Sequence, residues 1–319
     1  MRGSMERSSS IDVLKVILFL SVVLGHINTP FHNYIYAFHI PAFFFLSGFL
    51  MKRKTLSDVK LDFVKLIIPF VVFSIFGLIV EFLKCLMLRR DFPELSSMLY
   101  DVYINFDSTV PYYGFVLWFL PILFLSKLIS RCLLIRIDSI LMLSLISFIM
   151  LFFYVDYKYY LPSLFGIDKV LVAVPFVLFG FVYRELRLNK SWLSFSISIS
   201  FVGLCILYSS IPYFDIGSST VVYAGVSILF PIFLVTALLS IFEILEGKLS
   251  LPSQFLALCG SFSMLFFVFH PYTNNIAYLV ANFWGANYWL FKFILSVLFL
   301  SLFCVIKVRK RNLVVFKYV

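Results

Sequence analysis

Stretches of about twenty mostly apolar residues recur along nearly the whole chain, and they limit it to a fold that spans a membrane. Hydrophobic residues make up 62% of the sequence and charged residues 13%, about half of what soluble domains carry. We predict an all-α polytopic membrane protein, a bundle of about ten transmembrane helices in one domain over residues 1–319. The first four residues, MRGS, resemble a tag remnant and are left out of this prediction. The expected helices lie near 11–29, 33–51, 63–86, 113–130, 138–154, 169–185, 192–211, 220–244, 254–279 and 287–306.

The distribution of Lys and Arg predicts how this bundle is oriented. Basic residues gather in alternate loops, as in KRK at 52–54, and in the tail KVRKR at 307–311. The loops expected on the other side hold only Arg89, Arg90 and Lys158. Because cytoplasmic loops of membrane proteins are enriched in Lys and Arg, we predict that both termini are cytoplasmic. The net charge of +10 follows from these loops, so nucleic acid is not an expected partner.

Four ionisable side chains lie in the first apolar hairpin, Ile11–Met51: Asp12, Lys15, His26 and His39. Eleven residues separate Lys15 from His26, which is close to three helical turns, so both side chains lie on one face about 16 Å apart. Asp12 precedes Lys15 by three residues and can pair with it. Ionisable groups at membrane depth are usually functional. The alternative is a lysine that snorkels to the headgroups and a histidine that packs against a neighbouring helix.

The basic residue followed eleven positions later by His26, and then FHIPAFFFLSGFLM, resemble the acyltransferase type 3 family of integral-membrane O-acyltransferases. KLIIPF at 65–70, LWFLPILF at 117–124, FVLFGFVYRELR at 176–187 and GSFSMLFFVFHPY at 260–272 match in order. The family more often has Arg where this chain has Lys15, and that variant is similar to the fucose 4-O-acetylase-like branch. The resemblance runs from about Ile11 to about Ile306.

The resemblance implies that His26 is the catalytic residue. A hydroxyl acceptor needs a base, and a neutral imidazole can accept its proton. Lys15 and Lys65 would bind the acyl donor, because cations near the cytoplasmic end suit the phosphates of acetyl-CoA. Both lysines also fit a plain role as anchors at the membrane surface. Acetyl-CoA is then a substrate, and no bound cofactor is expected.

Further residues are candidates in supporting roles. Asp12 would pair with Lys15; His39 could orient the acceptor, bond His26, or make a structural hydrogen bond; Ser47, beside Gly48, would allow a close helix contact. Trp118 could stack on a substrate or belong to the core. Asp215 and His270 are possible acceptor contacts, with solvated-loop or capping roles as the alternatives. The histidines lack metal-ligand spacing, so no metal site is predicted.

The sequence therefore predicts a multi-pass O-acetyltransferase of the cell (inner or plasma) membrane. It would move an acetyl group from acetyl-CoA to a sugar hydroxyl of a surface polysaccharide or of its lipid-linked precursor. Membrane lipid and a carbohydrate or lipid-linked glycan are the expected partners. The alternative is a transporter or flippase of a polar or lipid-linked substrate. Transporters often have two related halves with broken helices at matching places, and the charged hairpin occurs here only once.

Overall fold

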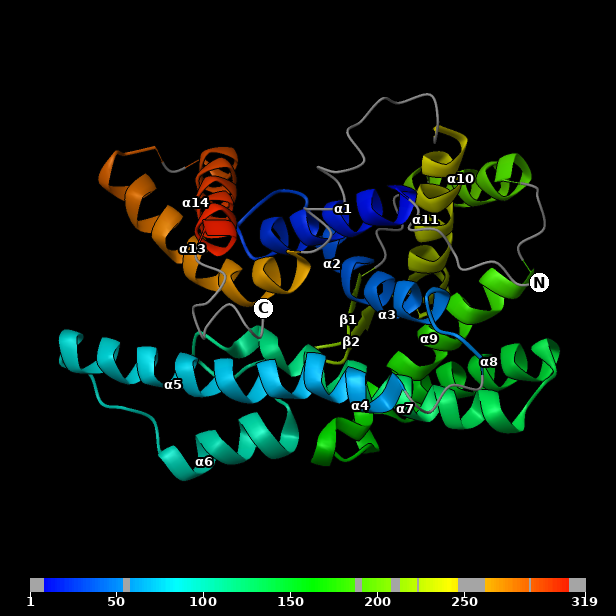
Figure 1. Cartoon of the computed structure of the whole chain (residues 1–319), viewed down its shortest axis with the longest axis horizontal. Helices are drawn as coiled ribbons and strands as arrows, with labels where there is room; N and C mark the ends of the chain where they lie inside the picture. Colours follow the sequence, from blue (N-terminus) through cyan, green and yellow to red (C-terminus); the bar gives the residue numbers. More distant parts are fainter. Residues whose placement is uncertain are drawn as a thin grey trace.

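The computed structural model describes residues 9–53, 58–186, 191–207, 213–222, 224–245, 262–286 and 288–309, and nearly all of these lie in helices (Figure 1). The first half contains α1 (Ser9–Gly25), α2 (His32–Tyr36), α3 (His39–Phe49), α4 (Asp58–Asp62), η1 (Phe63–Ile67), α5 (Ile68–Leu88), α6 (Leu95–Tyr100), η2 (Asp101–Asn105), η3 (Phe115–Trp118), α7 (Phe119–Arg136) and α8 (Ile140–Tyr157). The second half contains η4 (Lys158–Tyr160), η5 (Leu164–Gly166), α9 (Ile167–Leu186), α10 (Ser191–Leu207), β1 (Tyr213–Asp215), β2 (Thr220–Val222), α11 (Ala224–Leu245), α13 (Ser263–Phe283) and α14 (Trp289–Arg309).

The predicted helical membrane fold is confirmed, with six helical segments in the described residues long and apolar enough to cross a membrane. They are Asp58–Leu88, Phe115–Arg136, Ile140–Tyr160, Leu164–Leu186, Gly225–Leu245 and Trp289–Arg309. Two more of the expected spans form helices of 17 residues, α1 and α10. The count of ten and the cytoplasmic location of the termini stay predictions. The segment between α5 and η3 contains the short helix α6.

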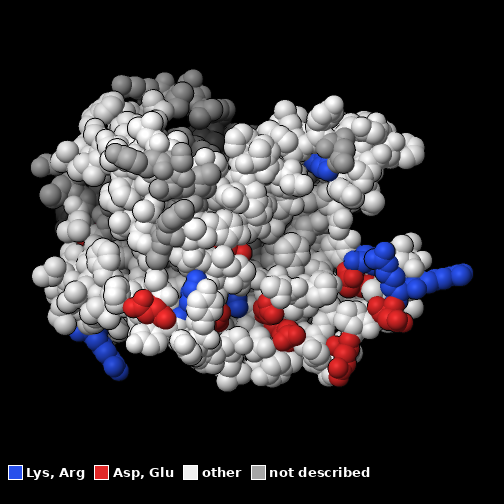
Figure 2. Space-filling view, turned by 180° about the vertical axis from the view of Figure 1, so that it is seen from behind, with Lys and Arg blue, Asp and Glu red and all other residues white. Residues whose placement is uncertain are grey.

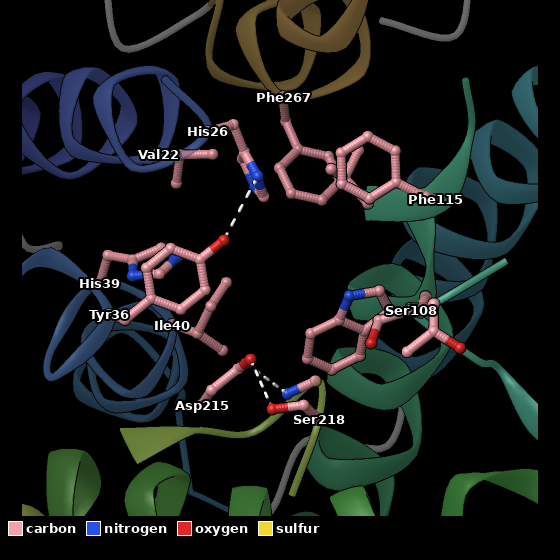
Figure 3. Close-up of a pocket in the computed structure, with 14 residues that line it drawn as sticks. Val22, His26, Tyr36, His39, Ile40, Ser108, Phe115, Asp215, Ser218 and Phe267 are labelled. Atoms are coloured by element: carbon pink, nitrogen blue, oxygen red, sulfur yellow. Dashed lines mark hydrogen bonds between the residues drawn. The ribbon is translucent and has the colours of Figure 1, made fainter. Parts of the chain in front are cut away.

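The expected span 33–51 is not one helix. It is divided into α2 and the 11-residue α3, which meet at Ala37 and Phe38. Pro41 explains the break, because a proline ring clashes with the carbonyl four residues earlier, here that of Ala37. Proline is tolerated in a first helical turn, and Pro41 lies in the first turn of α3. The break turns His39 and Tyr36 toward the end of α1 (Figure 3).

Helix α9 forms the centre of the bundle and packs against α3, α7 and α8. Its contact with α3 depends on two glycines that face opposite backbones. A Cβ atom at Gly48 would overlap the carbonyl oxygen of Val177, and one at Gly180 would overlap that of Phe45. The close approach expected beside Ser47 therefore occurs at Gly48. Arg184, at the end of α9, donates to the carbonyl oxygens of Phe49 and Met51 and so caps α3.

The outer helices expose apolar faces, as expected where lipid is the solvent. Helix α8 buries Leu143, Ser147, Leu151 and Tyr154 at helical spacing. Its opposite face exposes large apolar side chains: Leu141, Leu145, Phe148, Ile149 and Phe152. Figure 2 shows one side of the molecule, where most charged side chains lie in a lower band, a basic side chain lies at the upper right, and much of the other described surface is uncharged. The buried stripes fix each helix against the bundle.

Segments predicted to share a membrane side contact one another. On one side, Arg131 binds Asp62 at 2.6 Å and Arg53 donates to the carbonyl of Asp138 at 2.7 Å. On the other side, Ser219 donates to Asp168 at 3.1 Å and the rings of Tyr36 and Tyr213 stack at 6.0 Å. The β1–β2 hairpin belongs to this second side and lies near the centre of the view in Figure 1, in contact with α2. Each of these contacts joins segments that the prediction places on the same side of the membrane.

Candidate functional site

A cavity, here called the polar cavity, has a volume of about 200 Å³ and lies beside the end of α1 (Figure 3). Three histidine and carboxylate candidates from the sequence, His26, His39 and Asp215, line it together with Trp118. Its other lining residues are Val22, Tyr36, Ile40, Ser108, Thr109, Phe115, Val116, Gly217, Ser218 and Phe267. Residues far apart in the sequence thus converge on one small volume with both apolar walls and polar groups, the usual character of a ligand site.

His26 follows the last residue of α1 and is held on several sides by aromatic rings. Its ring stacks on His270, with centroids 5.1 Å apart, and meets the ring of Phe115 edge-on at 5.3 Å. The hydroxyl of Tyr36 lies 3.4 Å from Nδ1 of His26. One nitrogen of the imidazole therefore contacts a phenol while the ring plane is fixed by packing. Such restraint is what a positioned acid–base group requires.

His39 and His270 are anchored by their own helices. Nδ1 of His39 bonds the carbonyl of Ile35 at 2.7 Å, and Nδ1 of His270 bonds that of Phe267 at 2.8 Å. A carbonyl accepts, so each Nδ1 donates and each Nε2 of the neutral ring carries a lone pair. Nε2 of His270 is buried and makes no hydrogen bond within the described residues. Three roles were considered for His39, and the hydrogen bond to the carbonyl of Ile35 corresponds to the structural one.

Tyr36 is the residue of this site that the sequence analysis missed. Besides His26, its ring contacts His32 at 4.2 Å, His39 at 4.9 Å and Tyr213 at 6.0 Å. It therefore joins the three histidines of the hairpin to the β1–β2 strands. Pro41 could have indicated the position of Tyr36, because a helix break before this proline allows α2 to fold back over the end of α1.

Asp215 is the last residue of β1 and lines the polar cavity just before the turn that leads to β2. One carboxylate oxygen accepts from the backbone N–H of Gly217 at 2.9 Å, and the other from the hydroxyl of Ser218 at 2.7 Å. Burial and then the charge of Asp215 raise the pKa of the Tyr213 phenol, so this phenol keeps its proton. Below the turn, the carboxylate of Asp168 accepts from Ser219 and lies 3.5 Å from the ammonium of Lys169. The turn is thus fixed from both sides.

The second cavity, here called the lysine cavity, also has a volume of about 200 Å³ and lies toward the start of α1. Lys15 and Ser47 line it, and the predicted pair of Lys15 with Asp12 is present at 3.2 Å. The other lining residues are mostly apolar: Phe19, Phe43, Leu46, Leu50, Leu66, Phe119, Leu120, Leu123, Ser263, Met264 and Phe267. Lys65 is exposed and does not line this cavity. Lys307 lies 5.0 Å from the ring of Phe262, next to the lining residue Ser263, and the sequence analysis had not assigned it.

Phe267 of α13 lines both cavities and separates them. Its ring packs on Phe119 at 5.4 Å, and Phe119 packs on Phe43 at 5.9 Å. The two ends of the Lys15–His26 stripe of α1 therefore open into different cavities with an aromatic wall between them. No group of three metal-ligating side chains occurs in the described part of the chain.

Comparison with known protein families identifies the family of this chain. The model of an acyltransferase domain, that of the type 3 family, matches residues 8–308. The chain belongs to this acyltransferase family. No curated protein and no solved structure gives a significant match. The match spans nearly every described element, from α1 to α14, so the two cavities lie within the acyltransferase domain.

Membership in the family decides between the two classes of function that the sequence left open. The protein is a membrane acyltransferase, and the transporter alternative is not favoured. The fucose 4-O-acetylase-like branch stays a prediction. Among the residues expected to act together, the structure joins His26 with His39, His270, Asp215 and Trp118 in or beside the polar cavity. It places Lys15 and Ser47 in the lysine cavity and leaves Lys65 outside.

Proposed function

We propose that this acyltransferase moves an acetyl group from acetyl-CoA to a hydroxyl of a surface carbohydrate, or of its lipid-linked precursor, in the cell membrane. The observation that carries the proposal is the pair of cavities on either side of Phe267, one with a cation and one with a base. Acetyl transfer between two substrates of different polarity needs two such sites that meet at one point.

The donor would lie in the lysine cavity. The side chain of Lys15 is 27% exposed, and its ammonium offers a point charge to the phosphates of coenzyme A. Lys307, beside Phe262, is a second candidate cation at this cavity. The apolar lining between Lys15 and Phe267 suits the uncharged arm that carries the thioester. Displacement of the Phe267 ring would bring the thioester carbonyl to the polar cavity.

The acceptor would lie in the polar cavity with one hydroxyl at His26. Donation from Nδ1 of His26 to the oxygen of Tyr36 leaves the lone pair on Nε2, which takes the proton of the acceptor hydroxyl. The hydroxyl oxygen attacks the thioester carbonyl carbon, a C–O bond forms, and the C–S bond breaks. The coenzyme A thiolate leaves and takes the proton from the imidazolium, which restores the neutral base. Atoms and charges balance without a further reactant.

Purified protein in nanodiscs, given acetyl-CoA labelled in the acetyl group and a glycan acceptor, tests this proposal. We expect label on the glycan that mild alkali releases, since alkali cleaves oxygen esters and leaves acetamides intact. His26→Gln should abolish this label, while His32→Phe, which keeps an aromatic ring against Tyr36, should retain it. Transfer to the glycan at an undiminished rate by the His26→Gln protein would refute the assignment of the base.

A further inference from the structure

The charged side chains that line the polar cavity limit the kind of carbohydrate that it can bind. Among the described residues that line it there is one carboxylate, Asp215, and there is no lysine or arginine. The remaining polar groups are hydroxyls, backbone, the indole N–H of Trp118 and the rings of His26 and His39. Lys169 lies beneath the hairpin turn, where it is buried beside Asp168 at 3.5 Å, and it does not line the cavity.

This balance disfavours an anionic acceptor. A uronate or phosphate group would enter without a cationic partner, and burying an unpaired charge costs several kcal/mol. It would also approach the carboxylate of Asp215, and like charges repel strongly where water is excluded. In the proposed mechanism His26 must begin neutral to act as a base, so it does not offset this charge.

The same residues suit an uncharged sugar. Rings of Tyr36, Phe115 and Trp118 supply flat apolar surfaces, while Ser108 and Thr109 supply hydroxyls. Each carboxylate oxygen of Asp215 accepts one bond from the turn, and a carboxylate offers about four acceptor positions. Two positions therefore stay available for sugar hydroxyls.

Gly217 lines the cavity beside these groups and has no room for a side chain. A Cβ atom at this position would lie 3.0 Å from the hydroxyl of Ser108, 3.1 Å from the carboxylate of Asp215 and 3.2 Å from the indole of Trp118. The absence of a side chain thus lets the turn lie close to the indole ring without crowding the carboxylate. A larger side chain at Gly217 would fill the part of the cavity where Asp215 and Trp118 meet.

We propose that the polar cavity selects an uncharged sugar unit over an anionic one, and that Asp215 determines this specificity by accepting from sugar hydroxyls and repelling carboxylates and phosphates. The inference rests on the proposed function and narrows its acceptor class. It makes Asp215 a binding residue for the acceptor, whereas His26 is the base.

Binding can be measured separately from transfer by saturation-transfer difference NMR on the full-length protein in nanodiscs. The probes are a methyl hexopyranoside and the matched methyl hexuronide, which differ only in a CH₂OH and a carboxylate. Because the carboxylate of the uronide would meet the carboxylate of Asp215 with no cation beside it, we expect the uronide response to be weaker by about tenfold or more. Equal responses from the two sugars would overturn the inference.

Three variants assign the selectivity to this cavity. Asp215→Asn can keep the bond from the Gly217 N–H, and it should raise the uronide response to within about threefold of the hexoside response, because the repulsion is removed. Asp156→Asn, the same change at an exposed residue outside the cavity, should leave the tenfold difference intact. Gly217→Val should weaken the hexoside response, since it fills the cavity. An unchanged ratio in Asp215→Asn, or an unchanged hexoside response in Gly217→Val, contradicts the inference.

The transfer assay separates this inference from the proposed function. If the hexoside binds selectively but no ester forms with acetyl-CoA, the selectivity stands and the proposed reaction is wrong. If esters form equally on the hexoside and the uronide, the reaction stands and the selectivity is wrong.

Discussion

The polar cavity and the lysine cavity lie on either side of the same phenylalanine, yet they are built in opposite ways. The lysine cavity is lined by helices and is mostly apolar, with Lys15 as its charged group among the described residues. The polar cavity is lined in part by loops and a turn, and it collects hydroxyls, histidines and a carboxylate. In a membrane, polar groups without partners are costly, so their concentration at one place indicates function there. The difference suggests that one cavity carries the acyl group and the other performs its chemistry.

If the two cavities serve opposite sides of the membrane, exposed residues on the two predicted sides should differ completely in their access to a reagent. In a protein whose native cysteines are replaced, we expect Lys60→Cys to react with an impermeant maleimide only from the cytoplasmic side. Ser218→Cys should react only from the opposite side. Both positions are exposed. Labelling intact and permeabilised cells measures this, and reaction of both cysteines from one side would contradict the topology.

Among the site residues, replacement of the proposed base His26 should lower kcat the most. General-base help contributes about 10²–10⁴-fold to rate. His26→Gln should therefore lower kcat for acetyl transfer by about this factor, with little change in the amount of protein that inserts into the membrane. Steady-state kinetics with acetyl-CoA and the glycan acceptor measure the effect, and His32→Phe is the control. A near-normal kcat would require a different base, and His39 and His270 would be tested next.

The two cavities also differ in how far the sequence predicted them. Lys15 and Ser47 lie in the helices α1 and α3, and His26 directly follows α1, so the apolar pattern of the sequence was enough to assign each of them to a helical segment or its end. Tyr36 was not predicted as a site residue, because its position depends on the break at Pro41, and the apolar stretch around this proline looks continuous in the sequence. Asp215 was recognised as a loop carboxylate, but only long-range packing brings it to the same cavity as Trp118 of η3 and Val22 of α1. Lys65 was expected beside Lys15, and the sequence could not show which side of the helix at 63–67 faces the cavity.

Removing the charge of Lys15 from the lysine cavity should weaken binding of the acyl donor more than it slows the transfer step. Charge-assisted hydrogen bonds contribute about 1.5–3 kcal/mol, so Lys15→Ala should raise the KM for acetyl-CoA about tenfold or more with a smaller change in kcat. Lys15→Arg should restore most of the affinity because it keeps the charge. The matched control is Lys65→Ala, which removes an exposed lysine outside the cavity and should leave the KM unchanged. If Lys15→Ala kept its donor KM, this lysine would serve only as an anchor at the membrane surface.

Tyr36 should have the smallest effect, because it acts through His26. The 3.4 Å separation between its hydroxyl and Nδ1 of His26 is long for a hydrogen bond, and a typical neutral bond contributes about 1 kcal/mol. Tyr36→Phe keeps the ring contacts with His39 and Tyr213, so we expect kcat to fall only about fivefold with an unchanged KM for acetyl-CoA. In addition, the pH dependence of kcat should shift, since the imidazole loses a partner that distinguishes its two nitrogens. Tyr36→Ala should cost more, because it also removes the packing that joins α2 to the hairpin. If Tyr36→Phe changed neither kcat nor its pH profile while Tyr36→Ala lowered activity, the hydroxyl would have no part in orienting His26 and the role of Tyr36 would be packing alone.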